Sequence, residues 1–288
     1  MDSNLTRRIA VAVVAIPLAI ALTWYGSWPF VILVAVVTVL GTREVLNLAG
    51  HSKIDGFPLT ASVAAGALPA LSYAALTDNP FAHVWTSGWR DITAIWLMLI
   101  IVLALRHRTK AQQPLAAAAI TVFAVLYAAA LPTYLIEIRH AFWPVQSWPG
   151  TALVFFPLVV TWVCDSAAMF GGRIFGGPKL SPEISPAKTR SGALSGIVAG
   201  VLVAPIFTMF VFPQVEVPLT LLPAMLVALV LAMVGQLGDL AESLFKRAAG
   251  VKDSSALSPG HGGILDRFDS LYFVIPTAAI CYRLLGLL

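Results

Sequence analysis

Charged side chains are scarce in this chain of 288 residues: Asp, Glu, Lys and Arg make up 11% of it, whereas 59% of its residues are hydrophobic. The mean hydropathy is +0.87. This composition excludes an ordinary soluble domain, in which about 25% of the residues are charged. It predicts an all-α, polytopic membrane protein whose apolar runs cross the bilayer as helices.

Several common motifs are also missing. The sequence contains no G-x-x-x-x-G-K-[ST], no G-x-G-x-x-G and no H-E-x-x-H, which excludes a P-loop, a dinucleotide-binding turn and a zinc-protease helix. The only two cysteines, Cys164 and Cys281, lie in apolar runs and are typical of small buried hydrophobes. No repeat, low-complexity tract or linker divides the chain, so we expect residues 1–288 to form a single membrane domain.

Apolar runs predict about nine transmembrane helices. Arg7 and Arg8 precede the first run, but no small-residue cleavage site follows it, so we interpret it as a retained helix rather than a signal peptide. The fourth run is short for a span, although Trp85 and Trp89 extend it as interface anchors. The predicted spans are 9–25, 29–49, 59–76, 92–105, 115–136, 151–172, 192–212, 219–238 and 270–287.

The distribution of Lys and Arg predicts the orientation. With the N-terminus inside, fifteen of the 18 cations fall on the inner side, and only Arg90, Arg139 and Arg283 fall outside. Because cytoplasmic loops carry the excess of Lys and Arg, the segments 173–190 and 239–269 should face the cytoplasm. The protein is then expected in a bacterial inner (plasma) membrane. The net charge of +4 does not suggest a nucleic-acid partner.

The two halves of the sequence differ. Residues 1–150 are apolar spans with short loops and no polar constellation, whereas residues 151–288 carry nearly all the charged groups that suit catalysis. Within the second half, Gly192, Gly196 and Gly200 recur at intervals of four, a spacing that lets helices approach closely in lipid. This stripe indicates either helix packing inside the fold or the face of a homodimer.

A charged island lies between two apolar runs, where nine of the 31 residues 239–269 are Asp, Glu, Lys or Arg. Charge near hydrocarbon is costly, which favours a functional site over chance. If the eighth span continues as a helix, Asp239, Glu242 and Lys246 lie on one face of it. Carboxylates at helical spacing suit a hard cation such as Mg²⁺; the alternative is a solvated helix face with a Glu–Lys pair.

The motif S-P-G-H-G-G follows, and its glycines and proline exclude a helix and allow backbone N–H groups to approach an anion. Asp266, Arg267 and Asp269 come next, where the last span begins, and the helix dipole alone would also favour these carboxylates. Together with the acids before the turn, they supply four oxygen ligands within one hairpin. His261 is expected to contact a phosphate or nucleotide rather than to act as a base.

Asp165 lies inside the sixth span and must face the bundle interior or a water-filled cavity. It predicts a contact with a metal or polar substrate, the alternative being a buried structural hydrogen bond. The loop after this span offers Lys179, Ser185, Lys188 and Thr189 as a cradle for a polyphosphate. The same cations would satisfy the positive-inside rule in any cytoplasmic loop.

The charged island closely resembles the C-terminal signature of the phosphatidate cytidylyltransferases, the CDP-diacylglycerol synthases. The full spacing S-x-x-K-R-x-x-x-x-K-D-x-x-x-x-x-P-x-H-G-G-x-x-D-R-x-D is present from Ser243 to Asp269. The resemblance extends upstream through G-Q-L-G-D-L-A-E-S and V-C-D-S-A-A-M-F-G-G-R and covers about residues 150–288. It implies transfer of a cytidylyl group from CTP to phosphatidic acid, with release of pyrophosphate and a requirement for Mg²⁺.

The resemblance and the chemistry together give expected roles. Asp239 and Asp266 are the first candidates for metal ligands, with Asp269, Asp165 and Glu242 as further ligands, and a second cation is an open alternative. Lys246 and Arg267 are assigned, with Asp239 and Asp266, to catalysis. The expected contacts to CTP or lipid phosphates are Lys179, Ser185, Lys188, Thr189, Arg247, Lys252, Asp253, His261, Gly262 and Gly263.

Two other functions share some of these features. A CTP-dependent lipid or polyprenol kinase would use a similar site but release CDP instead of pyrophosphate. A transporter would place charged residues along a path through the spans, and the early spans carry almost none away from the cytoplasmic face. The expected partners are therefore CTP, phosphatidic acid and membrane lipid.

Overall fold

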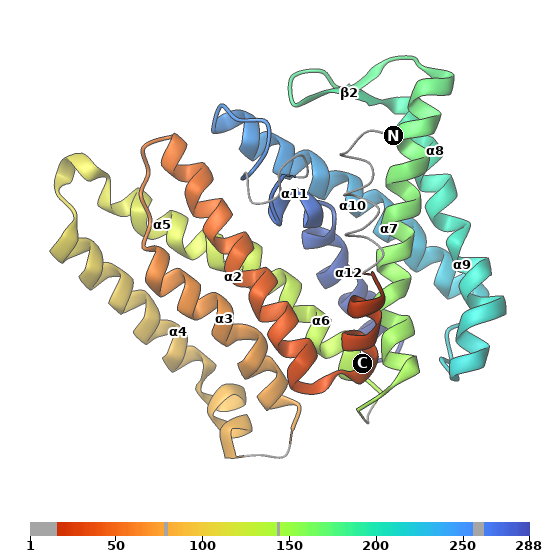
Figure 1. Ribbon diagram of the computed structural model, residues 1–288, viewed down its shortest axis with the longest axis horizontal. Coiled ribbons are helices and arrows are strands. Elements are labelled where there is room, and N and C mark those ends of the chain that lie inside the picture. Colours follow the sequence, from red (N-terminus) through yellow and green to blue (C-terminus); the bar gives the residue numbers. More distant parts are fainter. Residues whose placement is uncertain (1–15, 78–79, 143–144, 256–261) are drawn as a thin grey trace.

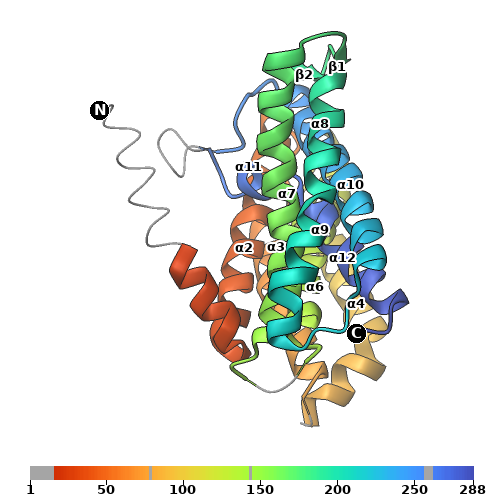
Figure 2. The same cartoon turned by 90° about the vertical axis from the view of Figure 1, so that its right-hand side faces the viewer.

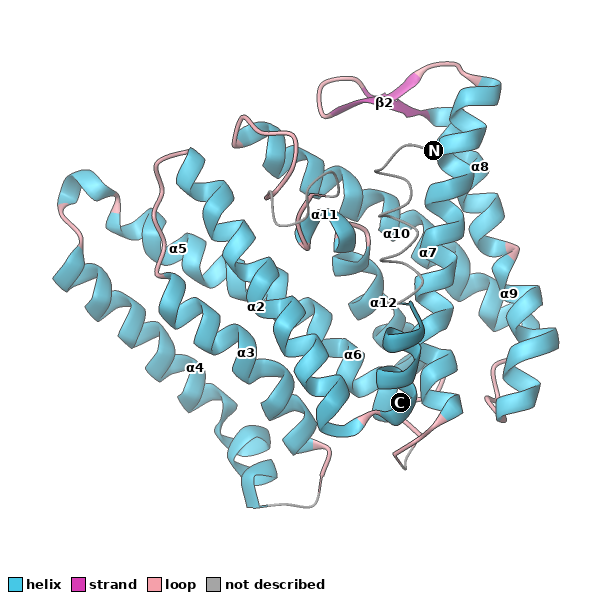
Figure 3. Cartoon of the chain, viewed as in Figure 1, coloured by secondary structure: helices cyan, strands magenta, loops and turns pink. Residues whose placement is uncertain are grey.

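The computed structural model describes residues 16–77, 80–142, 145–255 and 262–288, with side-chain environments for these apart from residues 80–85. Nearly all of this chain is helical, and the helices form one elongated bundle (Figures 1 and 3). In chain order, a helix at Ile16–Tyr25 is followed by α2 (Ser27–His51), α3 (Pro58–Ala75), α4 (Pro80–His107), η1 (Lys110–Gln112), α5 (Pro114–Val125), η2 (Leu126–Ala130), α6 (Leu131–His140), α7 (Trp148–Phe175), β1 (Lys179–Ser181), β2 (Ser185–Thr189), α8 (Arg190–Val201), α9 (Val203–Ile206), η3 (Phe207–Val211), η4 (Phe212–Val215), α10 (Leu221–Ala248), α11 (Leu265–Phe268) and α12 (Leu271–Leu284).

Six helical segments of the described chain are long and apolar enough to cross a membrane: Ser27–His51, Thr86–His107, Lys110–His140, Trp148–Phe175, Arg190–Val215 and Leu221–Ala248. Ile16–Tyr25 and Leu271–Leu284 are shorter apolar helices. The expectation of an all-α, polytopic membrane protein is confirmed, whereas the number nine stays a prediction. The fourth predicted span, 92–105, lies in α4, which is longer than predicted because the helix continues through Trp89, Arg90 and Asp91.

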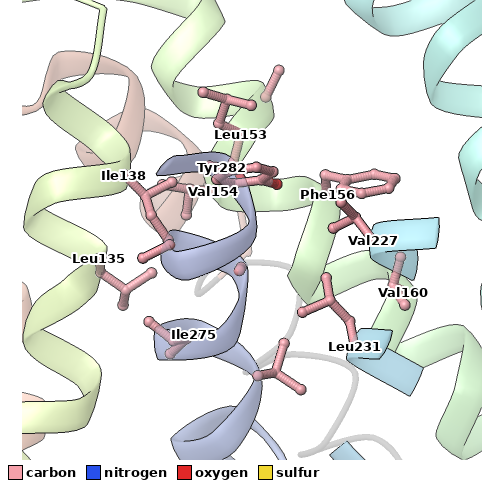
Figure 4. Close-up of a cluster of buried hydrophobic side chains, with 14 of the residues drawn as sticks. Leu135, Ile138, Leu153, Val154, Phe156, Val160, Val227, Leu231, Ile275 and Tyr282 are labelled. Carbon is pink, nitrogen blue, oxygen red and sulfur yellow. The ribbon is translucent and has the colours of Figure 1, made fainter. Parts of the chain in front are cut away.

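The main apolar core lies between α6, α7, α10 and α12 (Figure 4). Ile138 of α6, Leu153 and Phe156 of α7, Leu231 of α10 and Ile275 of α12 are all fully buried there. The hydroxyl of Tyr282 donates a hydrogen bond of 3.1 Å to the Leu153 carbonyl, which satisfies a polar group inside this core. This packing holds α7, α10 and α12 at fixed positions relative to one another.

Helices α7 and α8 pack closely because glycines line their contact. Gly192, Gly196 and Gly200 are all buried. A Cβ atom at Gly192 would lie 2.5 Å from the backbone oxygen of Ala168, and one at Gly196 would lie 2.7 Å from that of Cys164, both in α7, whereas one at Gly200 would lie 3.1 Å from the Ala232 side chain of α10. Of the two interpretations offered by the glycine stripe, helix packing inside the fold is therefore confirmed.

One part of the second half is not helical. The segment predicted only as an irregular loop after the sixth span contains an antiparallel hairpin, with Lys179 opposite Thr189 and Ser181 opposite Ser185. The positive φ angles of Gly176 (59°) and Gly177 (96°) end α7 and turn the chain into this hairpin. Figure 2 shows the hairpin at the upper end of α7 and α8, on the same end of the molecule as α11.

Candidate active site

The charged segments of the second half meet at one end of the bundle. The hairpin and residues 249–255, which follow α10, both lie at the upper end in Figures 1 and 2. Helix α10 brings its own charged residues there, because it continues past the predicted span boundary at residue 238 to Ala248. The prediction that Asp239, Glu242 and Lys246 lie on a helix continuing out of the eighth span is confirmed.

A pocket of about 560 Å³ lies between α7, the hairpin, α8 and α10. This volume is within the range of small-molecule sites. Thr189 closes one side as the N-cap of α8, where its hydroxyl accepts a hydrogen bond of 3.1 Å from the Gly192 amide. The pocket therefore owes its shape to a helix cap, two glycine-lined helices and a two-stranded hairpin.

Charged groups of both signs line this pocket. Asp165 of α7 and Asp239 of α10 supply carboxylates, and Arg173, Lys179 and Lys188 supply cations. Asp165 is exposed although it belongs to an apolar helix, because its side chain faces the pocket. The prediction that it faces a cavity is confirmed. Arg173 was not singled out as a site residue, although it stands as a lone cation at the end of an apolar run.

Lys188 forms an ion pair with Asp239 and thereby joins the hairpin to α10. Neither side chain is fully buried: 28% of Lys188 and 26% of Asp239 are exposed. The Lys188 nitrogen itself is buried against Asp239, so an anion that binds it would first have to separate this pair. An anion that entered the pocket would meet the Lys188 ammonium, and a cation would meet the Asp239 carboxylate.

Asp269 lies beside this pair, in the turn between α11 and α12. Burial and the nearby carboxylate of Asp239 raise the pKa of Asp269 to about 6, although the Ser270 amide and Lys188 act in the opposite direction. The carboxylates of Asp239 and Asp269 also act electrostatically on Asp165. The carboxylates of Asp239 and Asp269 thus act on each other and on Asp165 electrostatically, and a bound cation would relieve this repulsion.

A second charged group lies next to the first and is centred on Lys246. Its ammonium contacts the Asp266 carboxylate at 2.6 Å and the Glu242 carboxylate at 2.7 Å. Asp266 also accepts hydrogen bonds from the Ser254 amide (2.9 Å), the Ser254 hydroxyl (2.8 Å) and the Gly263 amide (2.8 Å). Burial alone would raise the pKa of Asp266, but these donors outweigh it and hold the pKa at about 2.

Glu44 of α2 completes this second group and was missed by the sequence analysis. Its carboxylate is buried and accepts four hydrogen bonds from the segment around α11. The donors are the Ser254 hydroxyl (2.9 Å), the Ser255 hydroxyl (2.7 Å), the Ile264 amide (3.0 Å) and the Leu265 amide (2.7 Å). The expectation that residues 1–150 contribute no polar constellation is therefore wrong. The sequence did contain a signal for this site, because Glu44 is an acid inside an apolar run.

The glycines before Asp266 have a structural explanation. Gly262 has a positive φ of 70°, and a Cβ atom there would overlap the Asp266 carboxylate. A Cβ atom at Gly263 would overlap both Glu44 and Ser254. The amide of Gly263 is directed to Asp266, so contact of these glycines with a phosphate stays a prediction.

The remaining predicted residues lie around these two groups. Ser185 begins β2, and the residues that line the pocket do not include it. Arg247 donates a hydrogen bond of 3.1 Å to the Val251 carbonyl at the exposed end of α10. Lys252, Asp253 and Arg267 are exposed at the same end of the molecule. His261 lies outside the described residues.

The predicted metal ligands are divided between the two groups. Asp165, Asp239 and Asp269 belong to the pocket side, whereas Asp266 and Glu242 both contact Lys246. Within the described parts of the chain, no three His, Cys, Asp or Glu side chains are gathered as a ready-made metal site. Mg²⁺ does not need one, because it is commonly held by one or two carboxylates with waters and substrate phosphates.

Comparison with known proteins identifies the family of this chain. Residues 6–285 match the model of the cytidylyltransferase family. The chain is 33% identical over 269 residues to a phosphatidate cytidylyltransferase of Staphylococcus epidermidis, covering 93% of this chain and 95% of that protein. It is 32% identical to a phosphatidate cytidylyltransferase of Bacillus subtilis, covering 95% and 96%, and 31% identical to one of Synechocystis, covering 94% of each. The chain belongs to the cytidylyltransferase family.

Proposed function

We propose that this protein transfers the cytidylyl group of CTP to phosphatidic acid, which forms CDP-diacylglycerol and pyrophosphate for phospholipid synthesis. One observation carries this proposal. A pocket large enough for a nucleotide opens between membrane-spanning helices, and it contains three cations and two carboxylates. The names of the relatives, which align over nearly the whole chain, supply the substrate class.

The reaction requires charge neutralisation more than a protein nucleophile. An oxygen of the lipid phosphate forms a bond to the α-phosphorus of CTP, and the bond from that phosphorus to the bridging oxygen of the β-phosphate breaks. Pyrophosphate carries the electron pair away. Because the attacking oxygen is already ionised, the protein mainly has to position anions that repel one another and to stabilise the charge of the transition state.

The cations of the site suit this task. Lys188, Lys179 and Arg173 line the pocket and would bind the phosphates of CTP. Lys246 is less exposed than Lys188 and is not among the residues that line the pocket; it lies between Glu242 and Asp266 and is held in one position by both carboxylates. We assign it to the reacting phosphates, because a fixed ammonium loses little entropy when an anion arrives.

Mg²⁺ is part of the proposal. The carboxylates of Asp239, Asp269 and Asp165 would hold it, since their hard oxygen donors repel one another and suit this ion. When bound, Mg²⁺ would neutralise the phosphate oxygens and orient them. Asp266 already accepts hydrogen bonds from Lys246, Ser254 and Gly263, which favours a role in holding Lys246.

Product analysis tests the proposal directly. Purified protein in detergent would be incubated with phosphatidic acid, Mg²⁺ and CTP labelled at either the α- or the γ-phosphorus. We expect the α-label in the lipid fraction and the γ-label in pyrophosphate. A CTP-dependent lipid kinase would instead place the γ-label in the lipid and release CDP, and that outcome would overturn the proposal.

The orientation of the protein in the membrane is also a proposal. We propose that the end bearing the hairpin and α11 faces the cytoplasm, where CTP is available, in a bacterial inner membrane with nine spans. The concentration of Lys and Arg in the segments at this end supports it.

A further inference from the structure

Glu44 connects two parts of the chain that are far apart in sequence. It belongs to α2, whereas the four donors found for it within the described residues lie at Ser254, Ser255, Ile264 and Leu265, at least 210 positions further along. Only 1% of Glu44 is exposed. A buried carboxylate without partners would be strongly destabilising, so the α11 segment and Glu44 depend on each other.

The donors come from both sides of the segment 256–261. Ser254 and Ser255 precede it, and Ile264 and Leu265 follow it. Asp266 binds the same two sides, through Ser254 and the Gly263 amide. Two carboxylates, one from each half of the protein, thus bring the two ends of this segment together.

Ser254 links the two carboxylates directly. Its hydroxyl lies 2.9 Å from a Glu44 oxygen and 2.8 Å from an Asp266 oxygen. Asp266 in turn contacts the Lys246 ammonium at 2.6 Å. A chain of contacts therefore runs from Glu44 through Ser254 and Asp266 to the lysine that we assign to the reacting phosphates.

We infer that Glu44 is a positioning residue for cytidylyl transfer: it fixes Ser254 and the start of α11, and through them it sets where Asp266 holds Lys246. The inference rests on the proposed function. Glu44 does not touch the CTP pocket, whose lining comes from α7, the hairpin, α8 and α10. Its loss should therefore affect turnover more than the binding of CTP.

The test uses Glu44→Gln. Glutamine has nearly the same shape as glutamate, but its NH₂ group would face donors that meet a carboxylate oxygen in the wild type. We expect kcat to fall about 10–100-fold, while the KM for CTP changes less than about twofold. Glu137→Gln is the matched control. That carboxylate of α6 forms an ion pair of 2.6 Å with Arg283 of α12, outside both charged groups of the site, and its loss should leave both constants unchanged.

A double-mutant cycle separates positioning from general stability. If Glu44 acts through Ser254, then Glu44→Gln combined with Ser254→Ala should be no slower than Glu44→Gln alone. The inference is overturned if the losses multiply, or if folded Glu44→Gln, isolated as a monodisperse peak, turns over within about twofold of the wild type. If Glu44→Gln does not fold, Ser254→Ala serves as the test on its own. An unchanged kcat in that variant would reject the proposed link from Glu44 through Ser254 to Lys246. An inactive wild type would instead reject the proposed function.

Discussion

Two lysines organise the charges of the site at the scale of single residues. Lys188 contacts Asp239 at the pocket, and Lys246 contacts Glu242 and Asp266 beside it. The two lysines differ in accessibility, because 28% of Lys188 is exposed but only 12% of Lys246 is. Lys188 also lines the pocket, whereas the residues that line it do not include Lys246. We therefore expect Lys188 to meet the incoming nucleotide and Lys246 to be fixed before the nucleotide arrives.

Replacing Lys188 by Ala should therefore weaken the use of CTP. We expect kcat/KM for CTP to fall by about 1.5–3 kcal/mol, the range for a charge-assisted hydrogen bond. Steady-state rates at varied CTP would measure it. Lys110→Ala is the control, because Lys110 is an exposed lysine in η1, away from the pocket. If Lys188→Ala and the wild type had equal affinity for CTP, Lys188 would not bind the nucleotide and would act only as a determinant of membrane topology.

Asp266 predicts a pH dependence of stability. Its pKa in the folded protein is about 2, whereas an unfolded Asp titrates near about 3.9. A lowered pKa stabilises the folded state above the unfolded pKa, and this contribution disappears as the pH falls through the folded pKa. The difference in unfolding temperature between wild type and Asp266→Asn should thus be constant above about pH 5 and shrink below about pH 4. A difference that stays constant down to pH 3 would contradict the assigned hydrogen bonds.

At the scale of elements, the close contact of α7 and α8 sets the width of the pocket, because Asp165 of α7 and Gly192 and Ala193 of α8 line it. Gly196 makes this contact possible: a Cβ atom there would lie 2.7 Å from the Cys164 oxygen and 3.0 Å from the Ala168 side chain. Backbone cannot move aside as a flexible side chain does. The helices would have to separate.

Gly196→Ala should consequently destabilise the protein by about 1–3 kcal/mol, the usual cost of overpacking. Gly88→Ala is the control, because no atom lies within 4 Å of the added Cβ in α4. Thermal unfolding in detergent would compare the two variants. If both unfold at the wild-type temperature, the α7–α8 contact is looser than the structure indicates.

The elements themselves could largely be predicted from the sequence, but not all of them. Apolar runs of about 20 residues predict helices, and the charged continuation of α10 follows from the spacing of Asp239, Glu242 and Lys246. The hairpin was not predicted, because Pro182 and Pro186 are typical of an irregular loop and each strand is short. The hairpin depends on a packed platform at the end of α7, which local sequence does not reveal.

At the scale of the whole molecule, both charged segments lie at one end of the bundle (Figure 1). Introduced cysteines can establish which side of the membrane this end faces. In a Cys281→Ser background, Glu183→Cys in the hairpin should be protected from an impermeant thiol reagent in intact cells and labelled after lysis. Gln214→Cys, in η4 at the opposite end, should be labelled in intact cells. The reverse pattern would invert the proposed topology.

The features that could not be predicted from the sequence depend on contacts between residues far apart in the chain. Glu44 meets donors more than 200 residues away, and no pattern within α2 indicates them. Arg139 was counted with the outer loops, but it is buried and donates to the carbonyls of Thr23 and Trp24. By contrast, Asp165 was expected at a cavity, because an apolar bundle tolerates an acid inside a span only there, and the pocket indeed brings it together with Asp239 and Lys188.

The central claim is that the carboxylates beside the pocket serve nucleotidyl transfer, and Asp239→Asn tests it most directly. This substitution preserves the shape of the side chain but removes its charge. Incorporation of α-labelled CTP into lipid would be measured for folded wild type, Asp239→Asn and Glu137→Gln at limiting Mg²⁺. We predict that Asp239→Asn loses at least about 100-fold in turnover, the scale of a lost electrostatic contribution to the transition state, while Glu137→Gln keeps wild-type activity. An Asp239→Asn protein that retained a large fraction of the wild-type rate would contradict the account.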